Sequence, residues 1–192
     1  ISDPIKDVAI LAEKLKDFDG IMVRSATLIS AEALQKATHL KVIGRAGAGV
    51  DTIDVDAATA RGIAVMNAPD GNTLAAAEHA VSLLFALARH IPRADAGMKA
   101  GEWPKNGLTG FELEGKRLGV IGLGRIGATV ARKAVGIGME VAAFDPFLPT
   151  SAAGRMSVPM KPLDELLAWA DIITLHIPRT KETTNIIGEA QM

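Results

Sequence analysis

The chain contains no cysteine, and this absence excludes disulfide bonds and thiolate chemistry. Neither sign of charge dominates, because 21 basic residues face 22 acidic ones, and no long basic run offers a surface for nucleic acid or an anionic membrane. The longest apolar stretch, around residues 80–88, is too short to span a bilayer, and no basic start followed by an apolar segment predicts a signal peptide. We therefore expect a cytoplasmic protein whose partners include neither nucleic acid nor membrane.

Apolar residues make up 48% of the 192 positions, which is enough for a buried core. In the first third of the chain, short apolar runs alternate with helical patterns, and this alternation predicts a small βα domain with a parallel sheet. Ser30 and Asp54 are predicted to cap two of its helices. The helical patterns cover residues 8–18, 31–37 and 55–60, and the predicted strands are 21–24, 41–43 and 63–66.

The segment NAPDGN, residues 67–72, concentrates turn-forming residues and is interpreted as a connector between two domains, 1–70 and 71–192. A long helix follows at Leu74 to His90, with Asn72 or Thr73 as its cap. Because this helix is apolar on nearly every side, we expect it to be buried, by a second subunit if not by its own domain. Burial by a second subunit would make the protein at least a dimer.

Residues 117–145 place a glycine triplet between a short β-branched run and a helical pattern, then end a second apolar run with an acid. Gly122 permits the tight turn, Gly124 lets backbone N–H groups approach a pyrophosphate, and Gly127 lets the helix pack closely on the sheet. The helix from Arg125 directs its positive dipole end at the phosphates. The pattern predicts a dinucleotide-binding unit.

Asp145 lies 21 positions after Gly124, where a carboxylate can accept hydrogen bonds from the adenosine ribose hydroxyls and repel a 2′-phosphate. The predicted cofactor is therefore NAD rather than NADP. The pattern continues with a helix near 163–169 and a strand at 172–176, which extends the parallel sheet. The fold class predicted for this half is α/β, a Rossmann-type doubly wound parallel sheet that is incomplete at its carboxyl-terminal side.

Four runs together resemble the D-isomer-specific 2-hydroxyacid dehydrogenases: VRSAT at 23–27, VIGRAGAGVDTIDVDAATARGIAVMNAPDGNT at 42–73, LGVIGLGRIG at 118–127 and DIITLHIP at 171–178. The resemblance implies a smaller, flavodoxin-like βα substrate domain beside the NAD domain. It also implies that the full-length protein oxidises a phosphorylated 2-hydroxy acid, 3-phosphoglycerate, with NAD in serine biosynthesis, as a homodimer or homotetramer. Reduction of glyoxylate or hydroxypyruvate within the same family remains open.

The resemblance also assigns site residues. On the substrate side, two cations and a loop are implied to face the substrate, and Arg suits bidentate recognition of carboxylate or phosphate; the residues are Arg24, Ser25, Arg45, Ala46, Gly47, Ala48, Gly49 and Asn72. On the cofactor side, the implied residues are Gly122, Gly124, Arg125, Ile126, Gly127, Asp145, His176, Ile177 and Pro178.

Residue types alone also suggest a catalytic histidine and a metal site. His176 is a titratable group at the end of a predicted parallel strand, but the resemblance places it beside the adenosine, so we do not predict it as catalytic. Asp51 and Asp54 suggest a metal site, yet no further ligands converge in sequence, and helix capping explains Asp54. We predict no metal site.

Hydride transfer needs a base, a carboxylate that raises the pKa of that base, and a cation for the substrate carboxylate. The family supplies a histidine, a glutamate and an arginine, all in segments expected after residue 192, so we predict no catalytic residue in this chain. ISDPI is interpreted as a first strand, and about twenty residues are expected but missing between Ile5 and Lys6. If Met192 were the true terminus, a non-catalytic NAD-binding dimerisation module would be the better interpretation.

Overall fold

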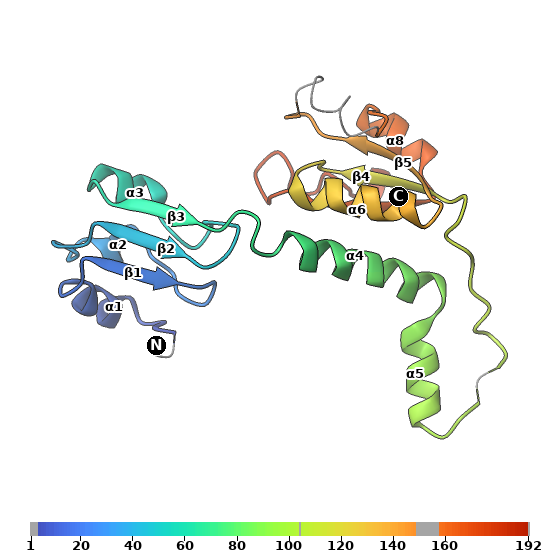
Figure 1. The fold of residues 1–192 in the computed structure, drawn as a ribbon, viewed down its shortest axis with the longest axis horizontal. Coiled ribbons are helices and arrows are strands. Elements are labelled where there is room, and N and C mark those ends of the chain that lie inside the picture. The colour runs from blue at the N-terminus through green and yellow to red at the C-terminus, as the bar shows by residue number, and fades with distance from the viewer. Residues whose placement is uncertain (1–3, 104, 149–157, 192) are drawn as a thin grey trace. The chain divides into compact units, whose positions relative to one another are not determined.

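The structure is a computed structural model that describes residues 4–103, 105–148 and 158–191. It divides into two compact units between Asn72 and Thr73 (Figure 1). The proposed first strand falls partly on residues 1–3, which lie outside the described residues, while Pro4 and Ile5 are not in a strand.

The amino-terminal unit is a three-stranded parallel sheet in the order β1-β2-β3, with one helix before each strand. Its elements are α1 (Val8–Leu15), β1 (Gly20–Val23), α2 (Ala31–Leu34), β2 (Val42–Arg45), α3 (Val55–Ala60) and β3 (Ala64–Asn67). Side chains cap all three helices. Asp7 accepts hydrogen bonds from two amides of α1, Ser30 accepts one from Ala33, and Asp54 accepts one from Ala57. The predicted capping roles of Ser30 and Asp54 are thus confirmed.

Within the described residues of this unit, the core packs on one face of the first sheet. Ile21, Ile43 and Val65 occupy matching positions on the three strands and pack into the core formed with α1, α2 and α3. On the opposite face, Met22 and Met66 flank Gly44 in one row and are 80% and 63% exposed. A parallel sheet is normally covered on both faces, so this bare face is an unusual feature of the unit.

The carboxyl-terminal unit contains a second parallel sheet in the order β5-β4-β6. Its elements are β4 (Arg117–Ile121), α6 (Arg125–Gly136), β5 (Glu140–Phe144), α8 (Leu163–Trp169) and β6 (Ile172–Leu175). The core with α6 and α4 (Thr73–Ala88) covers one face, and α8 covers the other (Figure 1). The chain passes from β4 to β5 on one side and then to β6 on the other, so strand order reverses at β4, where doubly wound folds bind ligands.

An ion pair joins the amino-terminal ends of β4 and β6, at the edge opposite to the glycine triplet. The Asp171 carboxylate accepts hydrogen bonds from the Arg117 guanidinium at 2.9 and 3.3 Å and from its backbone N–H at 2.9 Å. These bonds lower the pKa of Asp171 to about 2. The guanidinium also lies 5.8 Å from the centre of the Trp169 ring.

The helical region after residue 73 differs from the prediction in its length. The helix α4 ends at Ala88, and a second helix, α5 (Ile91–Lys99), follows a left-handed residue, His90, with φ of 52°. Within the chain, α4 leaves Leu83 and Leu87 56% and 60% exposed, so its burial by a second subunit stays a prediction. Of the two predicted caps, Thr73 lies inside the first turn, and its buried hydroxyl has no hydrogen-bond partner among the described residues, which leaves Asn72 as the predicted cap.

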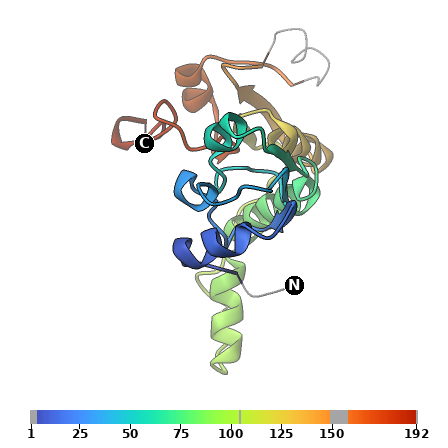
Figure 2. The same cartoon turned by 90° about the vertical axis from the view of Figure 1, so that its left-hand side faces the viewer.

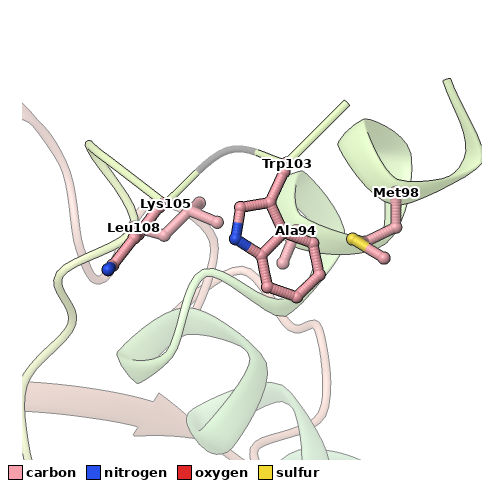
Figure 3. A pocket seen from close by; sticks show the side chains of 5 residues that line it. All are labelled: Ala94, Met98, Trp103, Lys105 and Leu108. Atoms are coloured by element: carbon pink, nitrogen blue, oxygen red, sulfur yellow. The ribbon is translucent and has the colours of Figure 1, made fainter. Parts of the chain in front are cut away.

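The end of α5 carries an apolar hollow of about 380 Å³ lined by Ala94, Met98, Trp103, Lys105 and Leu108. Figure 3 shows the Trp103 indole between Met98 on one side and Lys105 and Leu108 on the other. The helix α5 itself extends away from the sheet of its unit (Figures 1 and 2). Within the described residues, no single helix is long and apolar enough to cross a membrane. The pair α4 and α5 meets that test only jointly, with a bend of 70°.

Candidate dinucleotide and substrate sites

The glycine triplet forms the turn from β4 into α6, and two of its three positions leave no room for a side chain. Gly122 has φ of +89°, and a Cβ built on it would lie 2.6 Å from the carbonyl oxygen of His176. A Cβ on Gly127 would lie 1.9 Å from the carbonyl oxygen of Gly122, so α6 packs directly on the turn. Both positions therefore require glycine for steric reasons.

Gly124 differs, because a Cβ built there would meet nothing within 4 Å. It precedes the first residue of α6 in an extended conformation. The N–H groups of Gly124, Ile126 and Gly127 donate to no acceptor in the described part of the chain, and the first intrahelical bond runs from Ala128 to Gly124. Open space, unpaired donors and the positive end of a 12-residue helix together form a cradle for an anion.

Asp145 lies directly after β5, beside the same turn. One carboxylate oxygen accepts the N–H of Leu123 at 2.9 Å, and the other accepts the N–H of Phe147 at 2.9 Å. A carboxylate has about four lone-pair sites, so each oxygen can still accept a further hydrogen bond. The side chain thus orders the glycine turn and keeps acceptors for a diol.

The segment after β6 borders the turn on the other side. The N–H of His176 donates to the carbonyl oxygen of Ile121 at 2.8 Å, which extends the pairing of β6 with β4. The imidazole Nε2 lies 3.0 Å from the hydroxyl oxygen of Thr174, and burial lowers the pKa of His176 below its ordinary value. Ile177 packs against the α8 side of the core, and the carbonyl of Pro178 accepts the Thr183 hydroxyl at 2.6 Å.

All nine residues predicted for the cofactor therefore lie at one edge of the β5-β4-β6 sheet or in the first turn of α6. The edge is the carboxyl-terminal one, at the point where strand order reverses. Its central feature is the unpaired anion cradle of the glycine turn, with Asp145 on the β5 side and His176 on the β6 side.

The eight residues predicted for the substrate belong to the amino-terminal unit and follow its strands. Arg24 and Ser25 come directly after β1, Arg45 ends β2, and Asn72 ends the unit. Arg24 also lines a hollow of about 540 Å³ beside β1, together with Phe18 and Met22. The carboxyl ends of parallel strands meet at one edge of a sheet, so β1 and β2 bring both arginines to the same edge.

In the loop after β2, the four predicted residues are not equivalent. The N–H of Ala46 donates to Val23 and that of Gly47 to Arg45, both at 2.9 Å. The N–H groups of Ala48 and Gly49, in contrast, have no acceptor among the described residues. The loop can therefore offer two amides to an anion. Sequence reasoning overlooked Asn67, whose side-chain amide donates to the carbonyl oxygen of Ala48 at 2.6 Å.

The described residues contain no group of three or more His, Asp or Glu side chains placed to hold a metal ion. Asp54, one of the two acids considered as ligands, uses its carboxylate to cap α3.

Comparison with known proteins assigns the family. Residues 81–192 match the family model of the D-isomer specific 2-hydroxyacid dehydrogenase NAD-binding domain. The D-3-phosphoglycerate dehydrogenase of Archaeoglobus fulgidus is 50% identical over 181 residues, and that of Bacillus subtilis is 46% identical over 184 residues. These alignments cover 94% and 96% of this chain but only 34% and 35% of the relatives, so the chain spans about a third of their length.

Solved structures agree with this assignment. A protein from Thermus thermophilus is 34% identical, with a TM-score of 0.85 over 94% of this chain and 58% of that one. The D-lactate dehydrogenase of Aquifex aeolicus, solved with NAD and lactic acid, is 32% identical, with a TM-score of 0.82 over 94% of this chain and 54% of that one. The chain belongs to the family of D-isomer specific 2-hydroxyacid dehydrogenases, and it carries the NAD-binding domain of that family.

Proposed function

We propose that the natural polypeptide containing these residues oxidises 3-phosphoglycerate to 3-phosphohydroxypyruvate with NAD. The observation that carries this proposal is the likeness to relatives named D-3-phosphoglycerate dehydrogenase, which extends over both units rather than over the NAD-binding domain alone. Both predicted sites therefore lie within the region of likeness. The substrate-binding assignment of residues 1–70 belongs to this proposal.

On the cofactor side, we assign the pyrophosphate to the N–H groups of Gly124, Ile126 and Gly127, which have no acceptor among the described residues. Asp145 accepts hydrogen bonds from the adenosine ribose, and His176, Ile177 and Pro178 lie beside the adenosine. When bound, NAD accepts the hydride that leaves the substrate. Arg125 stands at the first position of α6, at the positive end of the helix.

On the substrate side, the amides of Ala48 and Gly49 hold the carboxylate and Arg45 contributes positive charge. A phosphorylated substrate carries a second anionic group, which we assign to Arg24, because a guanidinium binds phosphate with two parallel hydrogen bonds. Ser25 and Asn72 are the uncharged polar members of this site.

The experiment that tests the substrate assignment compares the Arg24→Ala variant with the unaltered natural polypeptide. We expect the KM for 3-phosphoglycerate to rise at least tenfold, because a charge-assisted bidentate contact contributes about 1.5–3 kcal/mol. Turnover of glyoxylate, which has no phosphate, should change little. If the unaltered protein reduces glyoxylate or hydroxypyruvate well and does not oxidise 3-phosphoglycerate, the substrate assignment is wrong and the protein is a reductase of the same family.

We further propose a second copy of this chain as the partner that covers α4 and α5. Leu74, Leu83 and Leu87 of α4 are each more than half exposed, and Trp103, in the segment that follows α5, is 77% exposed. Exposed apolar surface of this extent is typical of an interface. The proposal also includes a cytoplasmic location, which fits a chain without cysteine.

A further inference from the structure

The loop of residues 46–49 is tied to the end of β3 by two hydrogen bonds that point in the same direction. The backbone N–H of Ala68 donates to the carbonyl oxygen of Gly47 at 3.0 Å. The side-chain amide of Asn67 donates to the carbonyl oxygen of Ala48 at 2.6 Å. Two successive carbonyl groups of the loop are therefore held on the side that faces β3.

The geometry of the peptide bond determines where the next N–H groups of the loop point. In a planar trans peptide, the C=O of one residue and the N–H of the next point in opposite directions. Fixing the carbonyls of Gly47 and Ala48 toward β3 thus directs the N–H groups of Ala48 and Gly49 away from it. Two successive amides aimed to one side form a concave donor pair that suits an anion.

The surrounding side chains fit this use of the loop. The Arg45 guanidinium lies against Gly47, since a Cβ built on Gly47 would lie 1.8 Å from one of its nitrogens. The Asp51 carboxylate lies beside Gly49, with an oxygen 2.5 Å from a Cβ built there, and opposes an anion. Neither side chain controls the direction of the amides, which depends on the two bonds from β3.

We infer that Asn67 is a positioning residue for substrate: its amide holds the Ala48 carbonyl so that the N–H groups of Ala48 and Gly49 face the substrate carboxylate. This inference rests on the proposed function. It predicts a defect in binding every 2-hydroxy or 2-oxo acid, phosphorylated or not. In that respect it differs from the defect expected for Arg24→Ala, which is confined to the phosphorylated substrate.

The test uses Asn67→Ala and Asn67→Asp in the natural polypeptide. Asparagine and aspartate have nearly the same shape, but an ionised carboxylate cannot donate to a carbonyl, so both variants remove the bond. The matched control is Thr59→Ala, which removes another exposed hydrogen bond in the same unit, from the Thr59 hydroxyl to the Val55 carbonyl at 2.8 Å. Steady-state kinetics with 3-phosphoglycerate and glyoxylate are measured beside the Kd for NADH and the Tm.

We expect both Asn67 variants to raise KM for both substrates about tenfold, the equivalent of about 1.4 kcal/mol. The value of kcat and the Kd for NADH should stay within about twofold of the unaltered protein, and Tm should match that of Thr59→Ala. A KM no higher than in Thr59→Ala overturns the inference. So does a parallel loss of Tm, kcat and NADH affinity, because that pattern describes a merely structural side chain.

A second readout separates this inference from the proposed function. Oxalate, a small dicarboxylate, is titrated while the amide NMR resonances of Ala48 and Gly49 are followed. Shifts at both amides that weaken in Asn67→Ala support the positioning role, even if the unaltered protein turns over no 2-hydroxy acid and the proposed function is wrong. Absence of shifts in the unaltered protein overturns the positioning role whatever its activity.

Discussion

Replacing Asp145 tests the cofactor site most directly, because this carboxylate has two tasks that can be measured apart. It accepts the N–H groups of Leu123 and Phe147, both at 2.9 Å, and it is the proposed acceptor for the adenosine ribose. Each internal hydrogen bond contributes about 1 kcal/mol net. Asp145→Ala should therefore lower the free energy of unfolding by about 2 kcal/mol, and Asp145→Asn, which keeps one acceptor oxygen, by about 1 kcal/mol.

The effect on cofactor binding is expected to have a different pattern. Both variants lose the negative charge that repels a 2′-phosphate, so the ratio of the Kd for NADPH to that for NADH should fall about tenfold or more. Combining Asp145→Ser with Phe147→Arg should shift preference further, since Phe147 is exposed and a cation there can pair with the phosphate.

The assays are urea denaturation and fluorescence titration with NADH and NADPH. Glu140→Gln is the control, because it removes an exposed acid from the opposite end of the same strand. An unchanged ratio of the two Kd values in Asp145→Asn and in the double variant would refute the ribose assignment. Loss of stability without any change in that ratio would leave Asp145 with only its structural task.

Two further predictions concern acid stability and assembly. The folded-state pKa of Asp171 is about 2, below its ordinary 3.8, so the ion pair with Arg117 stabilises the fold above pH 3.8 and loses this effect as pH falls toward about 2. Asp171→Asn should flatten the fall of the urea midpoint over that interval, and an identical pH profile in the variant would contradict this. Leu83→Glu with Leu87→Glu should convert the proposed dimer into a monomer in light scattering, whereas Ser82→Glu on the same helix should not. A dimer that survives both leucine substitutions would exclude this face as the interface.

Most helices and strands could be predicted from sequence, because the interactions that form them join residues only a few positions apart. The helix cap at Asp54 and the helix over 55–60 follow from a side chain that reaches an amide three residues later, and the structure reproduces both. The helix over residues 163–169 and the strands β4 and β5 follow from apolar periodicity in the same way. The family comparison and the parallel sheets confirm the fold class.

The region around α5 shows where local signals are insufficient. The helix was predicted to continue to His90, because the apolar periodicity shows no break before this residue. In the structure the backbone of His90 is left-handed, and the chain bends there. A proline at the second position after His90 is the signal that could have indicated a new helix start. Periodicity reports the apolar faces of α4 but not what covers them, so the exposed leucines leave burial by a second subunit as a prediction.

The three glycines and Asp145 could be predicted from spacing alone, because the spacing of the glycines determines the path of the backbone, whereas residues 176–178 were predicted only by resemblance. The substrate loop could be named only by resemblance, and its four residues were treated alike. Hydrogen bonding within the fold distinguishes them, since Ala46 and Gly47 donate inside the chain while Ala48 and Gly49 do not. Asn67 escaped notice because its partner, Ala48, lies 19 positions away and forms no recognisable motif with it.

The exposed face of the first sheet carries two methionines whose oxidation can report whether this face is covered. Met22 and Met66 lie on either side of Gly44, and their side chains are open to solvent in the described chain. Hydrogen peroxide converts accessible methionine to the polar sulfoxide, and Met139, which is only 4% exposed, provides an internal standard. The relative oxidation rates in the natural polypeptide thus reveal, without any substitution, whether another surface rests on this sheet.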